Sequence, residues 1–278
     1  MPWYEVVGFI AFGFFVGTYG SMVGVGGGFL IVPLLLFLGV PARQAAGTSL
    51  VAVLLNGVSS TLSYLRQKRV DIKSGLIFSA AGIPGALLGA YVDQHVPHRV
   101  FTVLFGLLLI AVSVRAFLTR DEEPEIPNVR ATAADTPENH TTRDFVDAMG
   151  VHHRYHYHPW AAVAVSAATG FLASMFGIGG GTVQVPAMVY LFGFPTHVAV
   201  ATSQLIIFVT AVFGSATHAY YGDVLWLPAV LLGVGALAGA QLGAFFASRL
   251  RPGPLMRWFS LALVVAALYL IYNSTVRH

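Results

Sequence analysis

The chain has 278 residues, of which 56% are hydrophobic and only 10% are charged, and its formal net charge is +3. A soluble domain carries about 25% charged residues, so this composition is that of a polytopic membrane protein. The basic residues are dispersed at the ends of apolar runs, which does not indicate nucleic-acid binding, and the absence of cysteine excludes disulfide and thiol chemistry.

Four long apolar runs and one short run make up the first half of the chain, residues 1–118. The first long run, 3–23, ends at a glycine cluster, and the short run, 29–38, follows that cluster. A helix of ten residues reaches only about 15 Å, half of the roughly 30 Å hydrocarbon core. We therefore predict a half-helix that starts inside the membrane, where non-helical backbone is tolerated only within protein or beside a water-filled cavity. The other long runs lie at about 45–65, 74–91 and 100–118.

A polar linker at residues 119–158 separates the two apolar halves and holds eight of the twelve acidic residues. Its low hydrophobicity predicts an extramembranous, largely flexible segment with a short helix at residues 144–149. The tract at 152–158 contains four histidines, and such tracts are typical of metal sites. Two of its histidines would share a helix face, but histidine and tyrosine are also ordinary at a membrane interface. We therefore predict no metal site.

The second half, residues 159–278, repeats the order of the first. Its runs lie at about 160–176, 182–192, 198–221, 225–247 and 255–272. The cluster Ser21 to Gly28, followed by Val32-Pro33, returns 153 residues later as Ser174 to Gly181 and Val185-Pro186. Further pairs recur at an offset of 154, including Thr48-Ser49 with Thr202-Ser203 and Gly85/Gly89 with Gly239/Gly243. The chain is thus predicted to be all-α, with two repeats of about four full helices and one glycine-broken half-helix each.

Loop charges predict that the two repeats are inverted relative to each other. An odd number of segments per half would turn the second half over. The loop at 66–73 is basic, whereas its counterpart at 221–224 has no basic residue, and the next loop of the second half carries Arg249 and Arg251. Under the positive-inside rule the linker is then cytoplasmic and both termini lie outside.

The duplicated glycines are the first candidates for a substrate site. A break repeated in paired hydrophobic segments is a strong pointer to the binding site of a secondary transporter. Glycines free the backbone and expose N–H groups at a helix start, which carries partial positive charge and favours anions. The alternative is that they only permit tight helix crossing. The residues concerned are Gly26, Gly27, Gly28, Gly179, Gly180 and Gly181.

Polar side chains near the glycines are the second set of candidates. Their hydroxyl and amide groups are suited to bind substrate oxygens, but helix capping, bonds to backbone carbonyls and interhelical hydrogen bonds are the alternative roles. The set is Thr48, Ser49, Gln184, Thr202, Ser203 and Gln204.

Ionisable residues inside the predicted spans are sparse. The acids outside the linker all lie near predicted helix ends, and none lies at mid-helix to bind a cation or relay protons. Arg43, His197 and His218 are candidates for substrate attraction or proton coupling. An interfacial arginine and hydrogen-bonded histidines are the alternative interpretation.

At the duplicated Gly-Gly-Gly-x-x-x-Val-Pro pattern the chain resembles the sulfite exporter TauE/SafE family, also called the toluene sulfonate uptake permease family. The resemblance covers both halves, and the pairs Thr48-Ser49 and Thr202-Ser203 share it. It implies a plasma-membrane transporter of sulfur-containing anions such as sulfite, sulfoacetate or other organosulfonates, more often exported than imported.

The leading hypothesis is therefore an alternating-access exporter of a sulfur-containing anion. The alternatives are an importer of sulfur compounds or other organic anions, and a non-transporting membrane assembly factor or sensor. No catalytic motif supports an enzyme, and no cofactor is expected. The expected partners are a small anion and the lipid bilayer, without nucleic acid, and the oligomeric state stays open.

Overall fold

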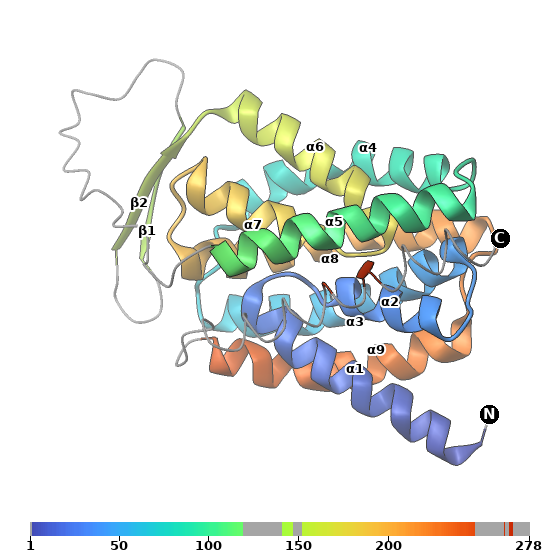
Figure 1. Cartoon of the computed structure of the whole chain (residues 1–278). Helices are drawn as coiled ribbons and strands as arrows, with labels where there is room; N and C mark the ends of the chain where they lie inside the picture. Colours follow the sequence, from blue (N-terminus) through green and yellow to red (C-terminus); the bar gives the residue numbers. More distant parts are fainter. Residues whose placement is uncertain (1, 119–140, 147–151, 248–263, 265–266, 269–278) are drawn as a thin grey trace.

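The computed structural model describes residues 2–118, 141–146, 152–247, 264, 267 and 268. Within them the chain is helical apart from one two-stranded sheet (Figure 1). The elements are α1 (Trp3–Val23), α2 (Gly28–Phe37), α3 (Ala42–Arg66), α4 (Ile72–Asp93), α5 (His98–Leu118), β1 (Thr141–Val146), β2 (His152–Tyr157), α6 (Pro159–Phe176), α7 (Gly181–Tyr190), α8 (Thr196–Tyr220) and α9 (Trp226–Phe246).

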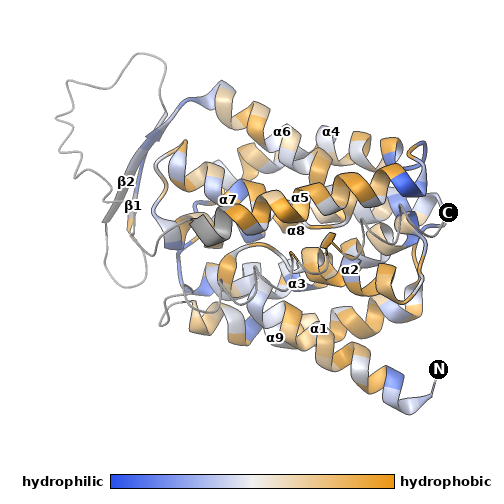
Figure 2. Ribbon diagram, viewed as in Figure 1, coloured by the Kyte–Doolittle hydropathy of each residue, from blue (hydrophilic) through white to orange (hydrophobic). Residues whose placement is uncertain are grey.

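Six of these helices are long and apolar enough to cross a membrane, namely α1, α3, α4, α6, α8 and α9. Figure 2 shows hydrophobic residues along the helices and hydrophilic ones mainly towards the ends of the bundle and on the hairpin. Large apolar side chains also point outward, as with Leu88 on α4, which is 58% exposed. Such an outer surface suits lipid rather than water. The prediction of an all-α polytopic membrane protein is confirmed, whereas the predicted run at 255–272 lies largely outside the described residues.

Each short helix begins at a left-handed glycine turn. Gly24, Gly26 and Gly27 have φ values between 83° and 89°, and Gly177, Gly179 and Gly180 have values between 71° and 81°. Only glycine adopts this region without strain, so the glycines end the long helix and start the next. The helices that follow, α2 and α7, have 10 residues each. The predicted short helices after the glycines are therefore present.

The main helix contacts join one half of the chain to the other. α1 packs along α9, and α6 packs along α4. The helices α3 and α8 contact each other; in addition, α3 contacts α9 and α8 contacts α4. These pairs are reciprocal, because α1 and α6, α3 and α8, and α4 and α9 are repeat counterparts. Small residues permit the close approach, as predicted: a Cβ on Gly85 would lie 2.0 Å from the carbonyl oxygen of Ala167, and one on Gly239 would lie 2.1 Å from that of Phe14.

The linker contains a β-hairpin, and the prediction of a helix at 144–149 is wrong for its first three residues. Residues Asp144 to Val146 belong to β1, which pairs antiparallel with β2, and 147–149 lie outside the described residues. The predicted shared helix face of the histidines is also wrong, because 152–157 form a strand. The physical reason is the alternation in β2, which buries Tyr155 and Tyr157 on one face.

Candidate functional site

The two glycine clusters meet at the interface between the halves. A Cβ on Gly28, the first residue of α2, would lie 2.2 Å from the carbonyl oxygen of Gly177. A Cβ on Gly181, the first residue of α7, would lie 2.1 Å from the carbonyl oxygen of Gly24. Each half-helix therefore starts against the turn that precedes the other. The structure brings the predicted glycines of both repeats to one place.

Two apolar side chains contact both glycine turns. A Cβ on Gly26 would lie 3.1 Å from Cγ2 of Ile207, and one on Gly179 would lie 2.8 Å from Cγ1 of Val53. Val53 and Ile207 are fully buried and occupy equivalent positions in α3 and α8. In this conformation, therefore, apolar groups pack directly against the glycine turns.

The two predicted serines hold the glycine turns from the opposite half. Ser49 Oγ donates to the carbonyl oxygen of Gly177 at 2.8 Å, and Ser203 Oγ donates to that of Gly24 at 2.9 Å. Both serines are fully buried. They therefore tie each turn to the central helix of the other half.

The two predicted threonines make an equivalent pair of contacts. Thr48 Oγ1 accepts a hydrogen bond from the backbone N–H of Leu225, the residue before α9, at 3.0 Å. Thr202 Oγ1 accepts one from the backbone N–H of Asp71, the residue before α4, also at 3.0 Å. Both hydroxyls therefore bond to backbone of the other half at the start of a helix.

Replacing Ser49 or Ser203 with alanine is expected to lower the free energy of unfolding by about 1–3 kcal/mol, because each change leaves a buried carbonyl without its donor. Thermal unfolding in detergent measures the loss. Thr217→Ala is the matched control, since the Thr217 hydroxyl bonds back to Phe213 of its own helix. Equal stability of all three variants would contradict the role of the serines.

Buried amides of both halves bond to the glycine region of the first half. Gln204 Nε2 donates to the carbonyl oxygen of Gly20 at 3.0 Å, and its Oε1 accepts from Ser60 at 2.9 Å. Asn56, which the sequence did not single out as a site residue, also bonds to this region, because its Nδ2 donates to the carbonyl oxygen of Gly26 at 3.2 Å.

Gln184 bonds instead within its own half. Its Oε1 accepts from Thr169 at 2.6 Å and its Nε2 donates to Ser166 at 3.4 Å, both on α6. Its amide therefore ties α7 to α6, within the second half.

Comparison with known proteins identifies the family of the chain. The profile of the family described as "Sulfite exporter TauE/SafE" matches residues 9–270. The chain belongs to this family.

Relatives in the family come from bacteria and an archaeon. The chain is 38% identical over 273 residues to a protein of Bacillus subtilis named "Probable membrane transporter protein YunE", covering 95% of this chain and 97% of the relative. A "Probable membrane transporter protein" of Xylella fastidiosa is 31% identical, with coverage of 95% and 94%. A relative from Methanocaldococcus jannaschii, also named a probable membrane transporter, is 25% identical, with coverage of 94% of both chains. No solved structure matches the chain. This TauE/SafE member is a multi-pass membrane transporter.

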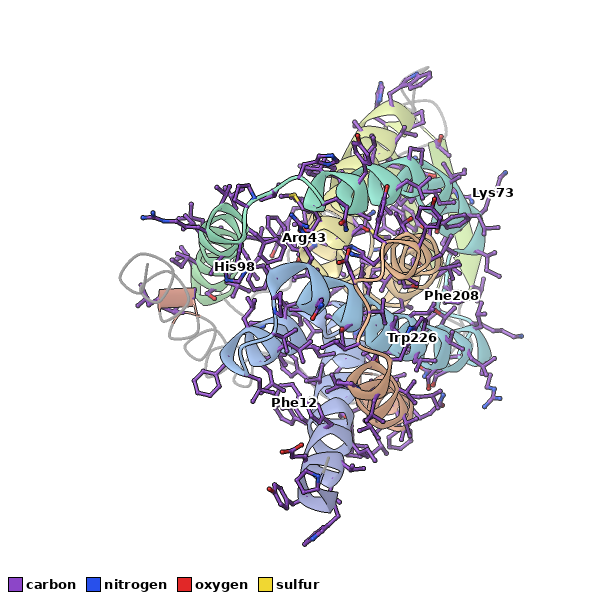
Figure 3. All side chains as sticks on the ribbon, turned by 90° about the vertical axis from the view of Figure 1, so that its right-hand side faces the viewer. Phe12, Arg43, Lys73, His98, Phe208 and Trp226 are labelled. Atoms are coloured by element: carbon purple, nitrogen blue, oxygen red, sulfur yellow. The ribbon has the colours of Figure 1, made fainter. Side chains whose placement is uncertain are left out.

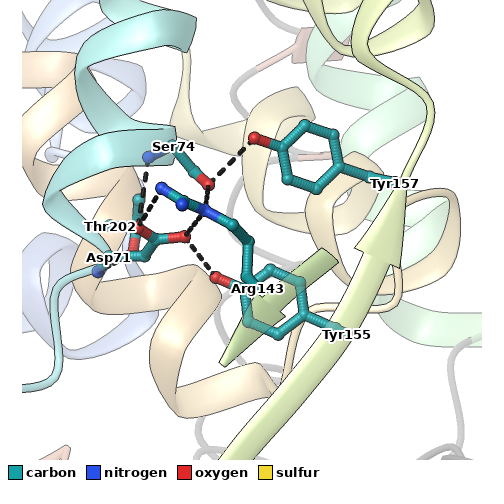
Figure 4. A network of polar contacts seen from close by, with 6 residues as sticks. All are labelled: Asp71, Ser74, Arg143, Tyr155, Tyr157 and Thr202. Carbon is teal, nitrogen blue, oxygen red and sulfur yellow. Dashed lines mark hydrogen bonds and ion pairs between the residues drawn. The ribbon is translucent and has the colours of Figure 1, made fainter. Parts of the chain in front are cut away.

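The hairpin of this TauE/SafE member docks on one end of the bundle through Asp71, a contact that the sequence did not reveal (Figure 4). The Asp71 carboxylate pairs with Arg143 Nη2 of β1 at 3.2 Å and accepts from the hydroxyl of Tyr155 of β2 at 2.5 Å. Ser74 on α4 bonds both to Arg143 and, at 3.0 Å, to the hydroxyl of Tyr157. The only signal in the sequence was an aspartate at the position of a helix N-cap.

Electrostatics fix the charge states in this docking contact. Burial alone would raise the pKa of Asp71, but hydrogen bonds from Ser74 and Tyr155, together with the charge of Arg143, hold it below its usual value. Burial and the neighbouring Asp71 carboxylate raise the pKa of Tyr155. An ionised Asp71 and a neutral Tyr155 therefore hold the hairpin on the bundle.

The three candidates for coupling lie at opposite ends of the molecule. His197 is in the first turn of α8 and His218 in its last, 21 positions apart, which is roughly 32 Å along a helix. Arg43 acts electrostatically on Asp93 and Asp223 at the end where His218 lies. Figure 3 views the molecule from this end, with Arg43 near the middle and His98 beside it. The structure therefore joins Arg43 to His218 and separates them from His197.

Proposed function

We propose that this protein exports a small sulfur-containing anion, such as sulfite or an organosulfonate, across the plasma membrane. The observation that carries the proposal is the meeting of the two half-helix starts at Gly28 and Gly181. The name of the family supports the substrate class and the direction.

The chemistry of the meeting point favours an anion. The first N–H groups of a helix have no acceptor within the helix, and its N-terminus carries about half a positive charge. Two such ends face one region between Val53 and Ile207. Oxyanions suit this setting, because backbone N–H groups bind their oxygens without a counter-charge.

Separation of the halves would open the site. The apolar pair Val53 and Ile207 closes the region in this conformation, and the hydroxyls of Ser49 and Ser203 bond across it. When the halves separate, each serine hydroxyl would donate its hydrogen bond to a substrate oxygen instead of to the carbonyl oxygen of the opposite turn. The serines then hold the closed state and bind substrate in the open one.

The arrangement of the chain supports inverted repeats. α1 begins at the end of the molecule opposite the hairpin, whereas α6 begins beside the hairpin (Figure 1). The reciprocal packing of α1 on α9 and of α6 on α4 agrees with a twofold relation between the halves. Such a relation lets one site face the two sides of the membrane in turn.

Loop charges support an orientation in the membrane, and the membrane potential supports export. With the basic loop at 66–73 and the linker in the cytoplasm, the hairpin end faces inward and the start of α1 faces outward. An inside-negative potential then favours anion exit by about 2.3 kcal/mol per charge for each 100 mV.

Flux into and out of proteoliposomes tests the proposal. Sulfite, sulfoacetate and taurine are the substrates to compare, and we expect outward movement of at least one anion above the rate of empty liposomes. Preferential uptake would identify an importer. If none of the three compounds were transported or bound, the proposal of a transporter for sulfur-containing anions would be overturned.

Leucine in place of Gly27 or Gly180 is expected to abolish that flux while membrane insertion is retained. Both glycines have positive φ, and a Cβ on Gly27 would lie 2.5 Å from Cγ1 of Val16. Surface labelling and yield report insertion, and Gly193→Ala, at a glycine with open space around it, controls for the strain of a positive φ alone. Unchanged flux in both leucine variants would remove the glycines from the site.

A further inference from the structure

A buried carboxylate lies at the end of the bundle opposite the hairpin. Asp93 is the last residue of α4 and is fully buried. Neither of its oxygens has a hydrogen-bond partner among the described residues. Removing an ionised carboxylate without partners from water costs far more free energy than removing the neutral acid. In this conformation the position therefore favours a bound proton.

A buried histidine, His218, completes the cluster. His218 is fully buried, and its Nε2 lies 3.0 Å from the carbonyl oxygen of Ser174. Because a carbonyl can only accept, Nε2 must carry the hydrogen and donate it. Nδ1 then carries no hydrogen in the neutral ring, and it lies 3.8 Å from Oδ2 of Asp223 without a hydrogen-bond partner among the described residues.

The surrounding charges make Asp93 and Asp223 unequal. Asp223 accepts a hydrogen bond from Gln94 Nε2. Although burial acts in the opposite direction, His218 and Gln94 hold the pKa of Asp223 below its usual value. Asp223 is thus the ionised neighbour, and Asp93, without a donor, is the acid that retains a proton.

The charged groups around the cluster come from several elements. Arg43 of α3, His218 of α8 and Asp223 of the following turn act on Asp93. α5 begins with His98 and Arg99, and Nδ1 of His98 accepts from the backbone N–H of Ala42. The last turn of α6, which packs along α4, has no titratable residue. The positive charge of Arg43 opposes a metal cation here, and the described residues contain no group of three or more histidine, aspartate or glutamate side chains placed to hold one.

We propose that Asp93 and His218 form a proton-binding site whose occupancy closes this end of the transporter. When the end opens, water reaches the Asp93 carboxyl, which ionises and gives its proton to the solution. When the end closes, the carboxylate takes up a proton from the same side and becomes neutral. Coupling of this step to anion movement rests on the proposed function, whereas the proton site itself does not.

Cysteine labelling tests the site without any substrate, because the chain has no cysteine of its own. Ala42→Cys places a reporter at a buried position of this end, and Trp226→Cys places a reference at an exposed one. The ratio of their maleimide labelling rates corrects for thiolate ionisation, provided that both thiols titrate alike. We expect this ratio to rise with pH, by up to tenfold per pH unit within the titration range if one proton is coupled to opening.

The Asp93→Asn variant mimics the protonated acid. It should give a low ratio that does not change with pH, while Asp144→Asn, at an exposed aspartate of the hairpin, keeps the pH dependence. A pH-independent ratio in the parent, or full pH dependence in Asp93→Asn, would overturn the proposal. A labelling ratio that depends on the Na⁺ concentration at constant pH would indicate a cation site instead of a proton site, and would also overturn the proposal.

Infrared difference spectroscopy of the protein without added cysteines gives a second readout. A carbonyl band of a protonated carboxyl should appear as the pH falls and be missing in Asp93→Asn, and its persistence in that variant would contradict the assignment. A protein with this band but without anion flux keeps the proton site and loses the proposed function. Anion flux in a protein that shows neither pH-dependent labelling nor the band would support the proposed function and overturn the proton site.

Discussion

Alanine in place of Gly28 or Gly181 is expected to prevent correct assembly of the two halves. The added Cβ would lie 2.2 Å or 2.1 Å from a backbone carbonyl of the other half, where no side chain can move aside. Overpacking typically costs about 1–3 kcal/mol, and contact between two backbones belongs at or above the upper end of that range. Thermal unfolding in detergent and the yield of folded protein in membranes measure the effect.

Gly8→Ala is the matched control for this prediction. Gly8 lies within α1, and nothing is within 4 Å of the Cβ that alanine would add. Alanine is the better helix former by about 1 kcal/mol, so this variant should be as stable as the parent or slightly more stable. If Gly28→Ala were as stable as Gly8→Ala, the close contact between the glycine turns would be wrong.

Alanine in place of Asp71 is expected to release the hairpin and to lower the free energy of unfolding by about 3–5 kcal/mol. Arg143 is only 14% exposed, and the substitution leaves its charge buried without its partner. Asp144→Ala is the control, because Asp144 is the next residue on β1 but is exposed. Protease cleavage within the linker, together with thermal unfolding, should distinguish the two variants.

Acid is expected to have the same effect as the Asp71 substitution. Since the folded state holds the pKa of Asp71 below its usual value of 3.8, the ionised form stabilises the protein fully above about pH 4. That stability is lost as the pH falls through the lower pKa of the folded state. Asp71→Asn should remove this part of the acid sensitivity, and an unchanged acid transition in the variant would contradict the assignment.

The repeated glycines predicted the break in each half because positive φ is a local property of the backbone. The length of the runs after Gly28 and Gly181 likewise predicted short helices, since length and hydrophobicity are read directly from the chain. The offset of 153–154 residues identified equivalent positions, and the structure shows these positions in reciprocal contact, as with Ser49 and Ser203.

The partners of polar groups could not be predicted in the same way, because they depend on which helices pack together. Asp71 and Asp93 both lie at ends of α4, yet Asp71 is bonded by the hairpin and Asp93 has no hydrogen-bond partner among the described residues. The sequence distinguishes them only as a residue before the helix and a residue at its end, which does not identify their partners. The hairpin is not predicted, because the alternation of Tyr155 and Tyr157 with polar residues is interpreted as ordinary interfacial side chains rather than as the period-2 pattern of a strand.

The packing of α1 on α9 has a consequence for how the protein is made. Gly13 and Gly17 of α1 fit against the carbonyls of Leu232 and Ala236, which the ribosome adds more than two hundred residues later. Until then the first helix has no partner for its glycine face, and the buried carbonyl of Gly24 lacks its donor from Ser203. Contacts so distant in sequence form slowly. The newly inserted first half is therefore incomplete in the bilayer until the second half has been made. A chain truncated before α9 would leave the glycine face of α1 uncovered and accessible to the insertion and quality-control machinery.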